Sequence, residues 1–272
     1  MKYKIYLLSI AFVAFFAGCN KDYPNPDTND CQDVVLAEGT YNDATNIMDE
    51  AAFNGRLPLY ADVQTPQDLS ACASITHSLT NLDTIIVDFG PSDCICSDNR
   101  YRRGQIIATL SSWYFDSTIV NGVVLSFNKY YVNDNLVQGT KTITFKGRNS
   151  STHNYEFSST TAGKITNKMG QTMTWNASEK KVVMNQQFYT DWIDAVYHIS
   201  GSGSGTGFNG TTYTSSITTD LVTKGACSYI TSGIMSVTPA GQSARIVNFG
   251  NDACDRYIDV TLDGNHYNIN QQ

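Results

Sequence analysis

The segment NGVVLSFNKYYV, residues 121–132, joins a tight turn to ten residues that favour a strand. Asn121-Gly122 is a hairpin turn of the type that needs positive φ angles, and residues 123–132 are rich in β-branched and aromatic side chains. Tyr130 and Tyr131 are adjacent, so in a strand they point to opposite faces of the sheet. At most one of them then belongs to the core of a two-layer fold.

The same composition continues over most of the chain, which is rich in Thr, Val, Ile, Tyr and Phe from Thr84 onward. Further strands are expected at 139–146, 172–183 and 213–222, and further hairpin turns at Asn209-Gly210 and Asp263-Gly264. The alternating Gly and Ser/Thr of residues 200–207 favour a strand that another backbone approaches closely, with a flexible linker as the alternative. The sequence predicts a mainly β fold, an antiparallel meander or sandwich-like sheet of about ten to twelve strands.

One helix is expected before the strands, over residues 34–54. Apolar side chains recur there at helical spacing, at Tyr41, Ala44, Ile47, Met48, Ala51 and Ala52. Asp43, Asp49 and Glu50 fall outside this stripe, and Gly55 stands where a C-terminal cap belongs. The pattern predicts an amphipathic helix that packs on the sheet and turns its acidic face to solvent.

A repeat bounded by cysteines gives the sequence internal symmetry. Cys72-Ala-Ser-Ile-Thr76 matches Cys227-Ser-Tyr-Ile-Thr231, and Val87-Asp-Phe-Gly90 matches Val247-Asn-Phe-Gly250. In both copies three residues separate the glycine from a cysteine, and residues 106–110 then correspond to residues 258–262. Each copy is expected to form a strand, a turn, a strand, a tight glycine turn and a strand, with a cysteine at either end of the hairpin.

Six cysteines remain when Cys19 is set aside: Cys31, Cys72, Cys94, Cys96, Cys227 and Cys254. An even number in an exported chain favours disulfides over metal or thiol chemistry. The repeat predicts Cys72–Cys94 and Cys227–Cys254, which leaves Cys31–Cys96 to tie the N-terminal segment to the first copy. An exchange of roles between Cys94 and Cys96 is the alternative. Each bridge is expected to stabilise the fold by about 3 kcal/mol.

Residues 1–18 have the features of a lipoprotein signal peptide. Lys2 and Lys4 precede an apolar run that ends in Phe16-Ala17-Gly18-Cys19. The run is shorter than the roughly 20 residues that a transmembrane helix needs. Cys19, directly after Ala-Gly, is therefore predicted to be lipidated and to become the mature N-terminus, anchored in the membrane by its acyl chains.

The segment after the anchor is polar, contains two prolines and is interpreted as a flexible tether over residues 19–30. Residues 31–272 show no linker and are predicted to form a single domain. Removal of residues 1–18 leaves 16 basic and 25 acidic side chains, a net charge of −9. Such a charge argues against nucleic acid as a partner and against binding to anionic lipid headgroups. The predicted location is the cell envelope at the outer membrane, with the surface and periplasmic faces both open.

Several motifs together resemble a family of uncharacterised Bacteroidota lipoproteins with paired cysteines. The segments that carry the resemblance are 87–90, 94–107, 128–133, 139–142, 199–203, 227–233 and 249–255. They extend over nearly the whole mature chain. The resemblance implies an exported, mostly β lipoprotein, and it implies no catalytic residue because the family has no assigned activity.

The search for catalytic and metal-binding patterns is mostly negative. The four histidines, at 77, 153, 198 and 266, are far apart and show no metal-ligand spacing. No GxSxG or HExxH motif and no cofactor motif occurs. A carboxylate pair such as Asp191 with Asp194 would suit glycoside hydrolysis, but acidic side chains are common in the turns of an acidic protein. A hydrolase of envelope or extracellular polymers is therefore the less favoured hypothesis.

Two features suggest ligand binding. The first is a set of aromatic residues that would stack on sugar rings if exposed, at Trp113, Tyr114, Tyr130, Tyr131, Tyr155, Trp175, Trp192 and Tyr197. The second is Arg100-Tyr-Arg-Arg103, a dense positive cluster that would receive an anionic glycan or a carboxylate. Arg100, Arg102, Arg103, Trp113, Trp175 and Trp192 are the candidate ligand contacts. The sequence predicts a non-enzymatic binding or structural lipoprotein, with a glycan or an envelope protein as its partner.

Overall fold

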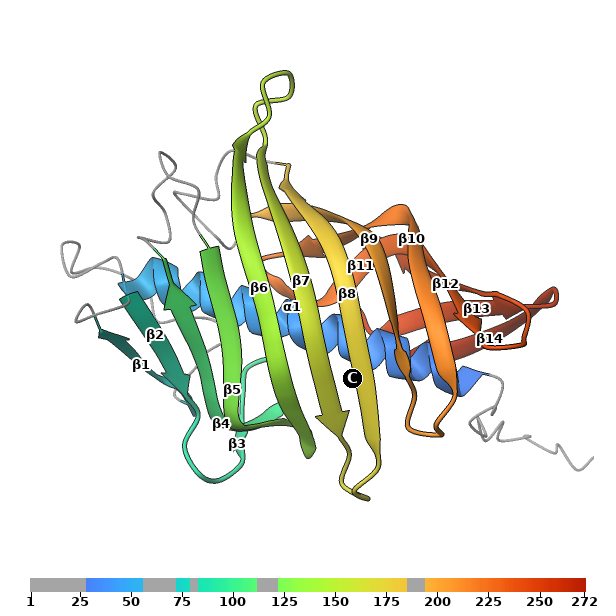
Figure 1. Ribbon diagram of the computed structural model, residues 1–272, viewed down its shortest axis with the longest axis horizontal. Coiled ribbons are helices and arrows are strands. Elements are labelled where there is room, and N and C mark those ends of the chain that lie inside the picture. Colours follow the sequence, from blue (N-terminus) through green and yellow to red (C-terminus); the bar gives the residue numbers. More distant parts are fainter. Residues whose placement is uncertain (1–27, 56–71, 79–82, 112–121, 185–193) are drawn as a thin grey trace, which may run out of the picture.

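The computed structural model describes residues 28–55, 72–78, 83–111, 122–184 and 194–272. These residues form one helix, α1 (Asn29–Gly55), and fourteen strands (Figure 1). The strands are β1 (Ser74–Ser78), β2 (Asp83–Asp88), β3 (Cys94–Ile95), β4 (Tyr101–Leu110), β5 (Gly122–Val132), β6 (Asn135–Arg148), β7 (Tyr155–Thr166), β8 (Thr172–Val183), β9 (Val196–Thr206), β10 (Thr212–Lys224), β11 (Cys227–Pro239), β12 (Arg245–Asn251), β13 (Tyr257–Leu262) and β14 (Asn265–Asn270). The fold is mainly β, as the sequence predicts.

The strands form one antiparallel meander in which sequence neighbours pair, and only the two-residue strand β3 lies off the path, beside β4. Local turns make this order possible. Asp263 and Gly264 turn β13 into β14 with φ angles of 49° and 81°, which confirms the expected hairpin turn. Strands outnumber the predicted ten to twelve because short elements such as β3 lack a run of β-branched residues.

Side chains alternate between the two faces of the sheet, as the period of two in a strand requires. In β8, Met173, Trp175, Ala177 and Glu179 are buried, whereas Thr172, Thr174, Asn176 and Ser178 are exposed. The Gly-rich segment predicted as a strand is β9. A Cβ on Gly203 would lie 2.4 Å from the ring of Trp175, so the alternating glycine makes room for an aromatic side chain inside the sheet.

The helix α1 runs across the strands inside the curled sheet (Figure 1). It contacts β1, β2, β4, β7, β8 and β11. It begins at Asn29, five residues earlier than predicted, and ends at Gly55, one residue beyond the predicted end. Within the part of the chain that the structure describes, no helix combines the length and the apolarity needed to cross a membrane.

The expectation that the acidic face of this helix is in solvent is wrong. Its six acidic side chains are all buried: Asp30, Asp33, Glu38, Asp43, Asp49 and Glu50. The reason lies in the sheet, which curls far enough to cover the helix on every side. A pattern of polar and apolar residues along the helix cannot reveal this, because a buried carboxylate needs partners from distant strands.

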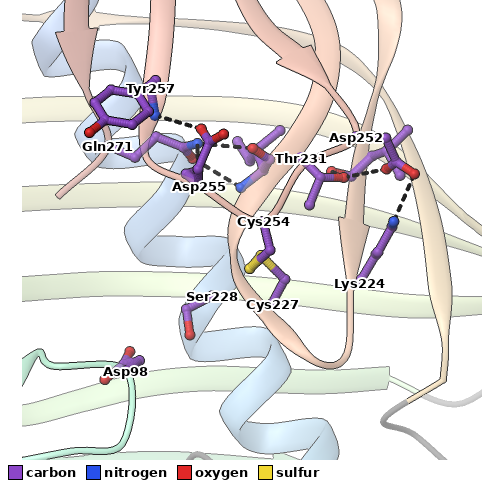
Figure 2. Close-up of a disulfide and its surroundings, with 12 residues drawn as sticks. Asp98, Lys224, Cys227, Ser228, Thr231, Asp252, Cys254, Asp255, Tyr257 and Gln271 are labelled. Carbon is purple, nitrogen blue, oxygen red and sulfur yellow. Dashed lines mark hydrogen bonds and ion pairs between the residues drawn. A yellow bond between two sulfur atoms is a disulfide. The ribbon is translucent and has the colours of Figure 1, made fainter.

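Two of the three expected disulfides are present, Cys72–Cys94 and Cys227–Cys254. Figure 2 shows the second of them. The third, Cys31–Cys96, is wrong, and both of these buried thiols are free. Cys96 lies near Asp43, twelve residues beyond Cys31 along α1. At 1.5 Å per residue these positions are about 18 Å apart, beyond the roughly 7 Å that a disulfide allows between Cα atoms. Burial also raises the pKa of the Cys31 thiol to about 12.

Candidate functional site

The arginine cluster does not face solvent as a unit. Arg100 and Arg102 are 4% and 2% exposed and point toward α1, whereas Arg103 points outward. Adjacent residues of a strand face opposite sides of the sheet, so the side chains of Arg102 and Arg103 must lie on different faces. The expectation that Arg100 and Arg102 contact a ligand at the surface is therefore wrong.

Both inward arginines bind carboxylates in the interior. Arg102 Nη2 lies 2.9 Å from Asp43 Oδ2 of α1, and Arg100 Nη1 lies 3.2 Å from Asp43 Oδ1. Arg102 also donates two hydrogen bonds to Asp98, of 2.8 and 2.6 Å. Burial raises the pKa of Asp98, but the hydrogen bond and charge of Arg102 and the charge of Arg100 outweigh it and hold this pKa below its ordinary value. Arg100 Nη2 donates to the Ser228 carbonyl of β11 at 3.1 Å, so this cluster joins β4, α1 and β11.

A second interior cluster lies between the middle of α1 and strands β6–β8. Lys141 Nζ donates to Asn42 Oδ1 at 2.9 Å and lies 3.4 Å from Glu179 Oε2, which also accepts from Ser159 Oγ at 3.2 Å. Burial and the neighbouring Glu179 raise the pKa of Glu38 well above its ordinary value. A side-chain hydrogen bond between Glu38 and Glu179 also raises the pKa of Glu38 and lowers that of Glu179. A cavity of about 20 Å³ lies beside this cluster.

The two ends of α1 have polar partners as well. Near the C-terminal end, Lys181 Nζ lies 3.3 Å from Asp49 Oδ2 and 3.7 Å from the ring centroid of Tyr197. Near the N-terminal end, Asp33 Oδ2 accepts from the backbone N–H of Phe208 at 2.9 Å, and burial raises its pKa to about 6. These interior charges hold the helix in the sheet, and the cavity beside them is small, with a volume of about 20 Å³.

The other sequence candidates are also mostly outside any surface site. Trp175 is 2% exposed, with its ring on Gly203, so its expected ligand contact is wrong. Trp113, Trp192 and Asp191 lie outside the described residues. Tyr130 is buried and Tyr131 is partly exposed, which confirms that the two tyrosines face opposite sides.

Three of the histidines pair with an aspartate: His77 with Asp83, His198 with Asp220 and His266 with Asp259. These pairs lie on different strands. Over the described ranges, no three His, Cys, Asp or Glu side chains are placed to hold a metal ion.

The open candidate site is a groove on the outer face of β2, β4 and β5, which we call the outer groove. It has a volume of about 410 Å³. Its lining includes Asp88, Pro91, Arg103, Gln105, Asn128 and Tyr131. A second hollow of about 370 Å³, lined by Asp93, Tyr101, Asn133 and Asp134, adjoins it. Arg103 lies between the two, because it pairs with Asp93 and Asp134.

Three polar side chains form a hydrogen-bonded row across the floor of the outer groove. Gln105 Nε2 donates to Asp88 Oδ2 at 2.8 Å, and Asn128 Nδ2 donates to Gln105 Oε1 at 2.8 Å. Asp88 Oδ1 accepts from the backbone N–H of Gly90 at 2.8 Å. The row is therefore fixed at one end by the Asp88 turn, while the amides of Gln105 and Asn128 keep further donors and acceptors for a ligand.

Arg103 and Tyr131 form the rim of the outer groove. The guanidinium carbon of Arg103 lies 3.8 Å from the ring centroid of Tyr131, a cation–π contact. Arg103 also bonds Asp93, and Asp134 at 3.2 Å. With two carboxylates on one guanidinium, the charge of Arg103 is already compensated, and the side chain acts as a clamp on the tyrosine ring.

The outer groove lies where the pairing of β4 with β5 and the pairing of β5 with β6 are both irregular. The β4–β5 register shifts between Arg103 and Gln105, and the β5–β6 register shifts between Ser126 and Tyr130. Gly104 has a φ of 80°, and a Cβ there would lie 1.9 Å from the Lys129 carbonyl oxygen. Lys129 itself has a φ of 47°, rare for a residue with a side chain. Bulges of this kind re-aim side chains and are common beside functional sites.

Sequence reasoning found Arg103 and Tyr131 but missed Asp88, Gln105 and Asn128. The signal in the sequence was Gly104, whose place in an otherwise strand-like run marks a bulge. Comparison of the chain with protein-family models, with curated proteins and with solved structures found no match. The fold and the outer groove are therefore the basis for a functional interpretation.

Proposed function

We propose that this chain is a lipid-anchored protein of the cell envelope, at the outer membrane, whose domain binds a ligand and catalyses no reaction. The signal-like residues 1–18 and the predicted lipidation of Cys19 support the anchor. The polar row and the clamped aromatic ring in the outer groove support a binding role, because they are fixed before any ligand arrives.

The observation that carries the proposal is the Cys72–Cys94 disulfide. Structural disulfides form and persist in oxidising compartments, such as the bacterial periplasm and cell surface. The same bridge holds the residue next to Asp93, which fixes Arg103 over Tyr131. One covalent bond thus supports both the predicted compartment and the geometry of the groove.

Cell fractionation of Cys19→Ala cells tests the anchor. We expect the variant to leave the membrane fraction and to appear in the soluble envelope fraction, because it has no acyl chains. Cys96→Ala is the matched control, since it removes a buried free thiol and should stay in the membrane. Unchanged membrane association of the Cys19→Ala protein would contradict the anchor.

Protease treatment of intact cells, with lysed cells as the control, assigns the face of the membrane. Loss of the protein from intact cells places the outer groove at the cell surface, and protection until lysis places it in the periplasm. A protein that is recovered in the cytosol, with its cysteines reduced, would contradict the proposed compartment.

A further inference from the structure

We infer that the outer groove binds a neutral oligosaccharide through Asp88, Gln105, Asn128 and Tyr131. This inference rests on the proposal that the domain is a binding module, and it names the chemical class of the ligand. It follows from the shape of the groove, from its hydrogen-bonding groups and from its charge.

The hydrogen-bonding groups suit a ligand that carries neighbouring hydroxyls. A hydroxyl both donates and accepts, and the row Asp88–Gln105–Asn128 offers a carboxylate acceptor followed by two carboxamides. Each carboxamide in the row uses one N–H within the protein, so its second N–H is free to donate to a ligand. No hydrogen bond within the described residues uses the carbonyl oxygen of Asn128, so it is available as an acceptor. The row lies on paired strands, so its spacing changes little on binding.

The charge of the site favours a neutral ligand over an anionic one. Three carboxylates, Asp88, Asp93 and Asp134, stand against two cations, Arg103 and Lys129. Arg103 is occupied by Asp93 and Asp134, and the anion-binding pair expected from the sequence, Arg100 and Arg102, is buried. Counted over the outer groove and the adjoining hollow together, the net charge is −1, and Lys129 is the one cation there that has no ion pair within the described residues. An acidic sugar would therefore meet net negative charge and no uncommitted guanidinium.

The shape favours an oligosaccharide over a single sugar. The outer groove and the adjoining hollow have volumes of about 410 and 370 Å³ and meet at Arg103. Tyr131 lies on one side of this residue, and Tyr101, which is 49% exposed, lies on the other. Each aromatic ring offers apolar area to the C–H groups of one sugar unit, while the ring hydroxyls of the sugar face the polar row.

Glycan-array binding of the purified full-length chain tests the inference, with printed neutral and acidic oligosaccharides as probes. We expect binding to a subset of neutral oligosaccharides. The variants Tyr131→Ala and Asn128→Ala should each weaken that binding at least about tenfold, because each removes one of the few contacts of a small interface.

Matched controls come from exposed positions elsewhere on the sheet. Tyr257→Ala removes a 64% exposed tyrosine from β13, and Asn176→Ala removes an exposed asparagine from β8. Both should bind within twofold of the unaltered chain. Near-identical circular dichroism and intact disulfides in all four variants exclude misfolding as the cause of lost binding.

Three results of the glycan-array experiment would overturn the inference. They are no binding to any printed neutral oligosaccharide, preferential binding to acidic ones, or binding that Tyr131→Ala and Asn128→Ala leave unchanged. A peptide ligand that is lost in the same two variants would also overturn it, while leaving the proposed binding role intact. Failure of the proposed function itself is separate, since it shows in fractionation as a protein without an anchor.

Discussion

The two cysteine-bounded copies share one local structure but differ in the segment beyond the second cysteine. In both, the valine and phenylalanine of the shared motif are buried. Asp88 Oδ1 accepts from the Gly90 N–H at 2.8 Å, and Asn248 Oδ1 accepts from the Gly250 N–H at 3.0 Å. Both glycines have positive φ, 79° and 96°. The motif is therefore a turn that is capped by the side chain before phenylalanine, and either Asp or Asn performs that role.

After the turn the copies diverge. In the first, β3 begins at Cys94 and the turn that contains Asp98 follows before β4. Asp98 pairs with Arg100 and Arg102, and both of these arginines also pair with Asp43 of α1. In the second, the chain passes from Cys254 directly to β13, where Asp255 Oδ1 accepts from the Tyr257 N–H at 2.9 Å (Figure 2). The stapled hairpin is thus common to both copies, and both contact α1, but only the first has the added segment with Asp98 and adjoins the outer groove.

Strand register differs as well. Val87 pairs with Ile106, whereas Val247 pairs with Val260, whose equivalent in the first copy is Ala108. The shift is of two residues, and an even shift keeps every side chain on its own face. Both copies therefore keep their apolar side chains in the core although their strand registers differ by two residues.

The largest expected effect is a difference in stability between two substitutions. One removes a buried ion-pair partner in the first copy, and the other removes an exposed partner in the second. Arg102→Met should lower the free energy of unfolding by about 3–5 kcal/mol, because it leaves Asp43 and Asp98 buried with a partner removed. Lys224→Met breaks the exposed pair with Asp252 and should cost about 1 kcal/mol or less. Urea unfolding with disulfides intact measures both, and equal losses would contradict the contrast.

The second effect concerns the disulfides, which close loops of similar length. Cys72→Ala/Cys94→Ala and Cys227→Ala/Cys254→Ala should each lower the free energy of unfolding by about 3 kcal/mol. Only the first pair should also weaken ligand binding, because only its bridge holds the wall of the outer groove. Thermal unfolding and glycan-array binding of both double variants measure the two effects. Equal loss of binding in both would show that the groove responds to general loosening of the fold.

A smaller effect tests whether the two copies are equivalent at the glycine turn. Gly90→Ala and Gly250→Ala each force a side chain into the left-handed region, at a cost of about 1–2 kcal/mol. A new Cβ has no atom within 4 Å at Gly90 and only a carbonyl oxygen at 3.8 Å at Gly250. The two losses, measured by urea unfolding, should therefore agree. A clear difference would mean that the shared sequence does not have a shared conformational role.

The smallest effect is a change in how folding stability depends on pH, and it is expected only at acidic pH. The pKa of Asp98 lies below its ordinary value in the folded chain, so its contribution to stability is present above about pH 4 and is lost as the pH falls further. The pKa of Asp252 is also lowered, by hydrogen bonds from Lys224 and Thr231, but this group is exposed. Asp98→Asn should flatten the slope of stability against pH below pH 4 more than Asp252→Asn does. Unfolding measured between pH 2 and 6 gives both slopes, and a steeper response to Asp252→Asn would refute this prediction.

Local patterns in the sequence predicted the strands, the hairpin turns and two disulfides, because each depends on residues close in the chain or on a repeated motif. The environment of α1 was not predictable in this way. Asp43 and Arg102 are 59 residues apart, and their contact depends on how far the sheet curls. The same curl buries Trp175, although the alternating glycines of β9 already indicated a close approach.

The outer groove was only partly predictable for a related reason. Arg103 and Tyr131 were found as residue types that bind ligands, but the row of Asp88, Gln105 and Asn128 depends on which residues face outward. Two bulges determine which residues face outward. Only one of them, at Gly104, is indicated by the sequence. Register, more than composition, therefore determines this site.

The position of α1 has a mechanical consequence for a protein anchored through its N-terminus. If Cys19 holds the lipid, tension from the membrane enters the domain at Asn29, the end of α1 that lies beside the turn between β9 and β10, and at no edge strand (Figure 1). Pulling then draws the helix lengthwise, so the bonds of Asp33, Asp43 and Asp49 bear the load together in shear. Because these bonds are loaded together, the domain should resist a higher force than a fold that is pulled apart one strand at a time. The buried carboxylates of α1 transmit the force from the anchor to the sheet.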